Sequence, residues 1–273
     1  MVNTVIFGEA DDYHVVAIAS HLDNPIVLDE ATIQNDITLT TGLFDTPAIR
    51  LDGELLKPTS VLWRNLDLDP FDTPHFPNDI AYFKLFLEAF KEADMVNPLS
   101  SFIDHYTKID QLRKAQVLFP PSLITNCWED AATFAEQFED VAVKPVSGGE
   151  YVKRFSAIEE FIEPMMLQEF IKGDNIRSFV IGERVYSAIA QSTLDDFRLD
   201  DEMTYQPIEL TAEQTATAVG IAKTLGYKYT AIDWIKRGDD LYFLEANFSP
   251  MFLFFEKQTG YPITDLLLKL LIQ

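Results

Sequence analysis

The sequence predicts an α/β (α+β) protein with more than one compact part, and three observations support this fold class. The chain of 273 residues is 47% hydrophobic and 12% aromatic, which is enough to build a sizeable core. Short apolar runs typical of buried strands alternate with segments whose apolar residues recur at helical spacing. The pattern changes after Asn97-Pro98, so we expect residues 1–95 to form a small domain of their own.

The first 95 residues are expected to mix short strands with two helices. Asp52-Gly53 is a strong hairpin signal between two apolar runs. Strands are predicted at 2–7, 25–28 and 61–64, a hairpin at 49–56, and helices at 12–22 and 78–93.

The remaining chain repeats this alternation. Thr211 is expected to cap one helix and Gly226 to end it. Helices are predicted at 108–117, 128–138, 211–225 and 263–271, and strands at 122–125, 141–146, 165–171, 178–189, 230–235 and 241–245. The last two strands are expected to form a hairpin with the loop Gly238-Asp239-Asp240.

The composition limits the functions that the protein can have. Asp and Glu number 44 against 21 Lys and Arg, so the net charge is −23, and such a surface repels nucleic acids and anionic lipids. A single cysteine, Cys127, cannot form an internal disulfide. The chain begins without a signal-peptide pattern, and its longest apolar stretch is too short for a membrane span. We therefore expect a cytoplasmic protein that binds neither nucleic acid nor membranes.

Three polar residues in the last predicted hairpin point to a metal. Glu245 and Asn247 are two apart on a strand, so they share a face, and a three-residue loop places Asp233 opposite Glu245. Like charges opposite each other destabilise a sheet, whereas two carboxylates and an amide oxygen suit Mg²⁺. The alternative is the solvated polar face of an ordinary hairpin.

Lys144 is a second candidate because it lies within the apolar run Val141-Ala-Val-Lys-Pro-Val. A buried lysine needs an anionic partner, and the Gly-rich turn Ser147-Gly148-Gly149 that follows can bring backbone N–H groups close to phosphate. The alternative is a lysine whose amine reaches solvent at a strand end. Farther along, the polar stretch from Lys172 to Arg177 is expected to connect two apolar strands, as a hinge or a hairpin loop.

In this order the segments resemble the ATP-grasp ligases, over about residues 97–273. Val-Lys144-Pro resembles the nucleotide-binding strand of that family, and Asp233…Glu245-Ala-Asn247 is similar to its metal-binding set. The run Gln168-Glu169-Phe170-Ile171 resembles its adenine-binding hinge. The resemblance implies an ATP-grasp fold with a preceding α/β domain at 1–95 and two subdomains at 96–172 and 173–273.

Further motifs resemble the RimK-like branch and, within it, the graspetide (microviridin-type) peptide synthetases. Asn175-Ile-Arg177 is similar to the Asp-Ile-Arg signature of the branch, and Asp196-Phe-Arg198 to its Asp-Phe/Trp-Arg motif. The segments 60–64, 108–126 and 256–263 look like those of the peptide synthetases. The chain departs from the family in a short Ser147–Tyr151 loop and in Phe-Ser-Pro-Met after Asn247.

The resemblance implies an ATP-dependent ligase that joins a carboxylate to an amine or hydroxyl through an acyl phosphate. Its cofactors would be ATP and Mg²⁺, with Mn²⁺ as a second option for the ion, and its substrate a peptide, such as a precursor peptide, or a small carboxylate or amine. A homodimer is left open. The competing hypothesis is a non-catalytic module of the same fold that binds a peptide or nucleotide.

The resemblance also assigns roles to individual residues. Arg198 and Arg177 would be catalytic, and Asp233, Glu245 and Asn247 would hold the metal. Either Asp174 or Asn175 would contact the ribose. The other nucleotide-binding residues would be Lys108, Lys144, Ser147, Gly148, Gly149, Gln168, Glu169, Phe170 and Ile171.

Overall fold

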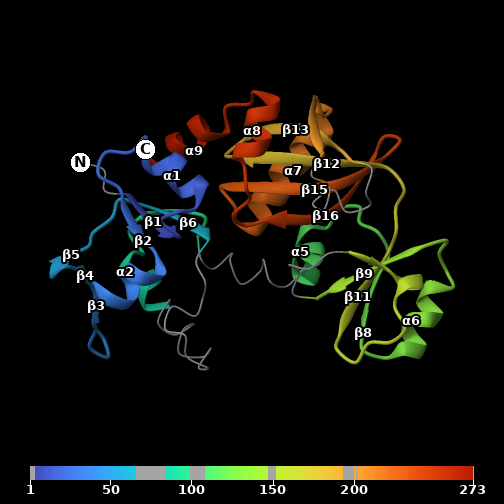
Figure 1. Ribbon diagram of the computed structural model, residues 1–273, viewed down its shortest axis with the longest axis horizontal. Helices are drawn as coiled ribbons and strands as arrows, with labels where there is room; N and C mark the ends of the chain where they lie inside the picture. The colour runs from blue at the N-terminus through green and yellow to red at the C-terminus, as the bar shows by residue number, and fades with distance from the viewer. Residues whose placement is uncertain are drawn as a thin grey trace. The chain divides into compact units, whose positions relative to one another are not determined.

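The protein is described by a computed structural model that covers residues 4–65, 84–98, 108–146, 152–192, 200 and 202–272 (Figure 1). The described residues form two compact units. One lies within Met1–Leu99, Met251–Phe254 and Pro262–Gln273, and the other within Ser100–Pro250 and Phe255–Tyr261. The domain boundaries at 95 and 172 are not tested by this division and stay predictions.

A parallel sheet forms the core of the first unit. Its strands lie in the order β2-β1-β6-β7 and span Ile26–Leu28, Thr4–Gly8, Ser60–Asn65 and Asp94–Val96. The central strand β1 is buried along its whole length, and the rings of Phe7 and Trp63 stack with centroids 4.0 Å apart. Burial on both faces is typical of parallel sheets covered by helices.

Three helices, a helical segment at 84–89 and a small antiparallel sheet also lie in the described part of this unit. The helices are α1 (Tyr13–Ala19), α2 (Glu30–Asn35) and α9 (Ile263–Leu271), and α9 packs against α1, β6 and β7. The small sheet contains β3 (Ile37–Thr40), β4 (Ala48–Leu51) and β5 (Glu54–Leu55). Its hairpin turns at Asp52 and Gly53, both with positive φ, so the predicted turn is confirmed.

The second unit contains two antiparallel sheets (Figure 1). The smaller one has the order β10-β9-β11-β8 and is built from Lys153–Arg154, Val141–Pro145, Met165–Glu169 and Ser122–Thr125. Helix α6 (Trp128–Ala135) packs on it, with Ala131, Val143 and Leu167 in the shared core. The short helix η1 (Phe155–Ala157) adds Phe155 to this core.

The larger sheet has five strands in the order β14-β13-β12-β15-β16. These are Thr204–Ile208, Arg184–Gln191, Asp174–Ile181, Tyr229–Arg237 and Asp240–Asn247. The helices α5 (Lys108–Ala115) and α7 (Ala212–Leu225) pack against each other; α5 also packs against β16, and α7 against β12, β13 and β15. Helix α8 (Leu253–Thr259) contributes Phe255, whose ring contacts Phe179 of β12.

The ends of α7 agree with the prediction. Thr211 accepts a hydrogen bond from the backbone of Gln214 in a capping box, and Gly226 ends the helix with a φ of 74°. The predicted helix at 78–93 is helical over 84–89, while its expected cap, Asn78, lies outside the described residues. Within the described chain, no helix has both the length and the apolar composition needed to cross a bilayer.

Three predictions are wrong in the larger sheet. The segment 178–189, expected as one strand, belongs to two, because β12 ends at Ile181 and β13 begins at Arg184 after a turn. Strand β12 begins at Asp174, so Asp174–Arg177 belong to the strand and do not form a connector. The hairpin between β15 and β16 turns through Gly238 and Asp239 alone, because Arg237 pairs with Asp240. Gly238 has a φ of 63°, which glycine adopts at no steric cost in such a two-residue turn.

His14, in the first turn of α1, is held in its neutral form by its surroundings. Its ring contacts that of Phe252, with centroids 4.7 Å apart, and its Nδ1 accepts a hydrogen bond from the backbone of Phe252 at 3.4 Å. Burial, and then the positive charge of Arg64, lower the pKa of His14 to about 4, although Asp12 acts in the opposite direction. The folded protein therefore excludes a proton that the unfolded chain accepts.

This exclusion predicts a loss of stability in mild acid. Between the unfolded-state pKa of 6.5 and the folded value of about 4, the unfolded chain binds more protons, so stability falls as pH falls through this window. We expect His14→Gln to flatten this part of the stability profile, measured by thermal unfolding from pH 7 to pH 4. The control is His21→Gln, at an exposed position, and an unchanged profile in His14→Gln would contradict the assignment.

Candidate active site

Three charged residues lie in one row across β12, β15 and β16. Arg177 lies opposite Asp233, and Asp233 opposite Glu245. Residues directly opposite each other in an antiparallel sheet have their side chains on the same face. Asn247, two residues beyond Glu245 on β16, lies on that face as well. The predicted pairing of Asp233 with Glu245 is therefore confirmed.

Both carboxylates of this row are neighbours of cations. Arg177 donates from Nε to Oδ1 of Asp233 at 2.7 Å and from Nη2 to Oδ2 at 2.8 Å, the two-pronged geometry of a strong ion pair. The side chains of the pair are only 14% and 11% exposed. Glu245 forms an ion pair with Nζ of Lys108 on α5, and Nδ2 of Asn247 donates to Oδ2 of Asp233 at 3.1 Å.

The ionisation of this site follows from these contacts. Burial alone would lower the pKa of Arg177, but the adjacent carboxylate of Asp233 outweighs it and raises the pKa. Tyr205 of β14 accepts a hydrogen bond from Nη1 of Arg177 at 3.4 Å, and burial raises the pKa of this phenol. The arginine is therefore charged and the tyrosine neutral at physiological pH.

A β-bulge places the two carboxylates on the same face. From the turn, Arg237 pairs with Asp240 and Trp234 with Phe243, a register that would bring Leu244 opposite Asp233. The register shifts between Asp233 and Trp234, so that Glu245 takes this place. The bulge thus leaves Phe243 on the face of Trp234 and turns Glu245 to the face of Asp233, as bulges beside functional sites do.

Gln111 fixes α5 to this strand, and sequence reasoning missed it. Its Nε2 donates to the backbone oxygen of Ala246 at 3.0 Å, and its Oε1 accepts from the backbone nitrogen of Ala246 at 2.9 Å. Ala246 lies between Glu245 and Asn247, at the outer edge of the sheet, and Gln111 is 1% exposed. One helical turn separates Gln111 from Lys108, so the same contact holds Lys108 against Glu245.

The predicted nucleotide-binding residues of the smaller sheet also meet. Lys144 is buried on β9, and its Nζ donates to Oε1 of Gln168 on β11 at 2.9 Å. Nε2 of Gln168 donates in turn to Oγ of Ser122 at 2.9 Å. A buried lysine is therefore embedded in a polar chain of three side chains on adjacent strands.

The segment that follows β11 is fixed from both sides. The backbone nitrogen of Glu169 donates to Pro121 and that of Phe170 to Asp140. The guanidinium of Arg154 lies 3.2 Å from the centre of the Phe170 ring, a cation–π contact. Ile171 is 3% exposed, so the segment that resembles an adenine-binding hinge is well ordered by local contacts.

The strand register separates the two ribose candidates. Asn175 is two residues from Arg177 on β12 and shares its face, whereas Asp174 lies on the opposite face. Only Asn175 thus lies on the same face as Arg177, Asp233 and Glu245, the three residues that form the acidic row. The predicted residues Ser147, Gly148, Gly149 and Arg198 lie outside the residues that the structure describes.

The acidic row has the donor chemistry that Mg²⁺ requires. In the described part of the chain, no three His, Cys, Asp or Glu side chains cluster in a way that would hold a metal. The donors on the shared face are two carboxylates and the amide oxygen of Asn247, which leaves room for water or phosphate oxygens, as is usual for Mg²⁺. Asp233, Glu245 and Asn247 therefore have the donor types that suit the ion, while in this structure Arg177 and Lys108 pair with the two carboxylates.

Replacing Lys144 tests the second cluster. Lys144→Met keeps the apolar stem and removes the charge, so we expect ATP affinity to fall at least tenfold, about 1.4 kcal/mol. Calorimetric titration with ATP measures this change. Lys153→Met, at an exposed position on the neighbouring strand β10, is the control, and unchanged affinity in Lys144→Met would favour a purely structural lysine.

Comparison with known proteins identifies the family. Residues 104–271, more than half of the chain, match the model of the RimK-like ATP-grasp domain. The chain therefore belongs to the RimK-like ATP-grasp family, and the family predicted from the motifs is confirmed. A search of curated proteins returns no match.

Solved structures of ATP-grasp ligases share the fold over the whole chain. The ATP-grasp ligase PsnB complexed with minimal precursor is 26% identical, with a TM-score of 0.84 and coverage of 100% of this chain and 98% of that one. The macrocyclase MdnC bound with precursor peptide MdnA, from Microcystis aeruginosa MRC, is 19% identical, with a TM-score of 0.81 and full coverage of both chains.

A third similar structure has a lower TM-score. It is the Chryseobacterium gregarium RiPP-associated ATP-grasp ligase in complex with ADP and a leader and core peptide. It is 19% identical, with a TM-score of 0.75, and the alignment covers 99% of this chain and 96% of that one. At this level of identity the likeness shows the fold, and the predicted fold class is confirmed.

Proposed function

We propose that this protein is an ATP- and Mg²⁺-dependent ligase that joins a side-chain carboxylate of a peptide to an amine or hydroxyl, as an amide or an ester. The observation that carries the proposal is the row of Arg177, Asp233 and Glu245, with Lys108 and Asn247 beside it. Peptide-modifying ATP-grasp ligases such as PsnB, which has been solved with Mg and ADP, support the substrate class and cofactors.

Carboxylates and cations in this row have complementary tasks. Asp233, Glu245 and Asn247 would hold Mg²⁺, which supplies charge neutralisation for the nucleotide phosphates. Lys108 and Lys144 would contact those phosphates, together with the backbone of Ser147, Gly148 and Gly149. The segment 168–171 would contact the adenine and Asn175 the ribose.

The reaction has two displacement steps. The substrate carboxylate attacks the γ-phosphorus of ATP, and ADP leaves as the acyl phosphate forms. The amine or hydroxyl then attacks the acyl carbon, loses its proton, and phosphate leaves. Arg177 and Arg198 would stabilise the charge on the transferred group, so that the protein acts by positioning and electrostatics.

The experiment that tests this proposal measures product and phosphate together. The protein is incubated with ATP, Mg²⁺ and short peptides rich in Thr, Ser, Asp and Glu. We expect phosphate release that depends on peptide, and a peptide mass reduced by one water for each new bond. Peptide binding without phosphate release or mass loss would favour the non-catalytic binding module.

Arg198→Ala separates the two hypotheses further. A donor that meets charge developing in the transition state contributes more there than in the ground state, so we expect kcat to fall roughly 10²-fold with little change in ATP affinity. Arg198→Lys should restore only part of the rate, because lysine lacks the planar two-pronged donor. A kcat that survives Arg198→Ala in single-turnover assays would exclude this role. The use of Mn²⁺, a homodimer and a cytoplasmic location stay predictions.

A further inference from the structure

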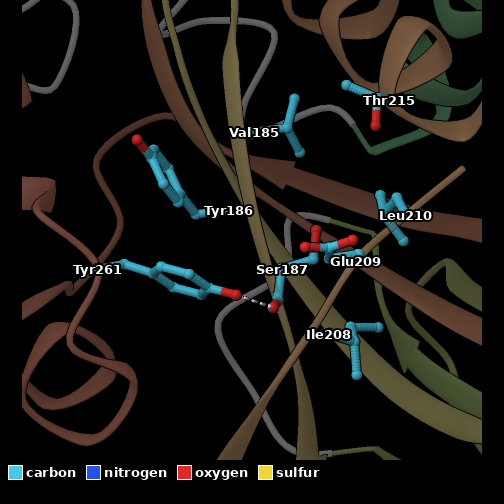
Figure 2. Close-up of a pocket in the computed structure, with 8 residues that line it drawn as sticks. All are labelled: Val185, Tyr186, Ser187, Ile208, Glu209, Leu210, Thr215 and Tyr261. Carbon is cyan, nitrogen blue, oxygen red and sulfur yellow. Dashed lines mark hydrogen bonds between the residues drawn. The ribbon is translucent and has the colours of Figure 1, made fainter. Parts of the chain in front are cut away.

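A cleft of about 280 Å³ lies at the edge of the five-stranded sheet, beside the end of β14 (Figure 2). Its walls include the rings of Tyr186 and Tyr261, the carboxylate of Glu209, and Val185 and Ser187 of β13. The volume is below the roughly 300–1,000 Å³ of pockets that enclose whole small ligands. The cleft therefore has the size for one side chain of a longer molecule.

Part of the sheet edge beside the cleft carries no paired strand among the described residues. The last residue of β14, Ile208, pairs with Ser187, and the chain then leaves the sheet toward α7. Among the described residues, no strand pairs with Val185 and Tyr186 on this side of β13. Exposed strand edges of this kind accept extended peptides in many complexes.

The walls of the cleft favour a positive charge. The rings of Tyr186 and Tyr261 lie with centroids 4.9 Å apart, and the hydroxyl of Tyr261 donates to the backbone oxygen of Ser187 at 3.3 Å (Figure 2). Burial, followed by the negative charge of Glu209, raises the pKa of Tyr261, so the carboxylate and the phenol are close enough to interact. None of the eight described residues that line the cleft is basic.

A continuous set of aromatic contacts connects the cleft with the acidic row. Tyr261 stacks with Phe255 at 6.0 Å between centroids, and Phe255 contacts Tyr205 edge-on at 4.9 Å. Tyr205 is the phenol that accepts a hydrogen bond from Arg177. Tyr186 thus lies on the face of the sheet that carries Arg177, and Tyr261 packs on it, whereas Val185 and Ser187 lie on the opposite face, so the cleft wraps around the edge of β13.

We propose that this cleft binds a basic side chain, arginine or lysine, of the peptide that the enzyme modifies. Cations are attracted to the faces of tyrosine rings, and an adjacent carboxylate adds an ion pair. A basic residue held here would fix the register of an extended peptide, and so select which of its carboxylates reaches Arg177. That the bound side chain belongs to the substrate peptide rests on the proposed function. Binding of a basic side chain to the cleft can be measured without turnover.

The experiment uses the full chain labelled with 3-fluorotyrosine, whose ¹⁹F signals are assigned with Tyr186→Phe and Tyr261→Phe. The probes are N-acetyl-arginine methylamide, its lysine analogue, and the uncharged isostere N-acetyl-citrulline methylamide. We expect the arginine or lysine compound to shift the signals of Tyr186 and Tyr261 saturably, and the citrulline compound to need at least fivefold higher concentration. Glu209→Gln should weaken the binding at least fivefold, and Glu136→Gln, at an exposed position at the C-terminal end of α6, should not.

The outcomes are distinct from those of the ligase assay. Absence of saturable shifts, equal shifts with citrulline, or full binding in Glu209→Gln would each overturn the proposed cleft. Saturable, charge-dependent shifts in a protein that releases no phosphate would support the cleft while the ligase function fails. In an active enzyme, Glu209→Gln should raise the KM of an arginine-containing peptide and leave kcat and the KM of its citrulline counterpart unchanged.

Discussion

Glu245→Ala should reduce peptide-dependent phosphate release at least 100-fold while the protein stays folded. Partners that merely orient metal ligands cost 10–100-fold when lost, so the loss of a ligand itself should reach or exceed the upper end of this range. Glu245 is 21% exposed at the side chain and is the ion-pair partner of Lys108, so the variant should lose some stability without unfolding. Phosphate release at saturating ATP measures the activity, and thermal unfolding measures the fold.

Two further variants test whether the loss of activity comes from the loss of a metal ligand. Glu245→Gln keeps the shape and one oxygen donor, so we expect it to recover part of the activity at raised Mg²⁺. Asp240→Ala removes an exposed carboxylate from the start of the same strand and should stay within twofold of the wild type. Activity of Glu245→Ala close to the wild-type value would remove Glu245 from the metal site.

The sequence predicted the pairing of Asp233 with Glu245, although it predicted the wrong loop length. The expected loop had three residues, whereas the observed turn has two and a bulge supplies the missing residue farther along. Both routes bring the same two carboxylates opposite each other. Turn signals identify a hairpin from its sequence, but a bulge depends on packing of both faces, here Phe243 against Trp234, and carries no local signal.

Strand β14 was not predicted, because its sequence contains a proline. It reads Thr-Tyr-Gln-Pro-Ile and contains Pro207, a residue that argues against a strand except at a sheet edge. The structure places it at that edge. Its one buried member, Tyr205, contacts Arg177, so a weak strand with a single aromatic residue completes the site.

The contacts of Lys108 and Gln111 could not be predicted, because their partners on β16 lie far along the chain. The sequence does contain one signal for Gln111. It is a polar residue next to Leu112 on the buried side of a short helix, and buried polar groups almost always have hydrogen-bond partners. The resemblance to a family indicated Lys108, whereas the role of Gln111 follows from the structure alone.

Arg177→Met should produce the largest loss of stability among the site variants. It leaves the carboxylate of Asp233, 11% exposed, without its two-pronged partner, and breaking a buried pair from one side costs about 3–5 kcal/mol. The remaining hydrogen bond from Asn247 and the partial exposure reduce our expectation to about 2–4 kcal/mol. Urea unfolding followed by tryptophan fluorescence measures the change, because Trp234 is the next residue on β15 and is buried.

The double variant Arg177→Met/Asp233→Leu separates stability from chemistry. Replacing both members of a buried ion pair by apolar residues is often neutral or stabilising, so the double variant should regain most of the stability that Arg177→Met loses. Its turnover should stay at least 100-fold below the wild type, because a metal ligand and a charge-stabilising arginine are both absent. A stable double variant that still releases phosphate at the wild-type rate would show that the pair serves the fold alone. A stable but inactive double variant would show that the buried Arg177–Asp233 ion pair is needed for the reaction and not for the fold.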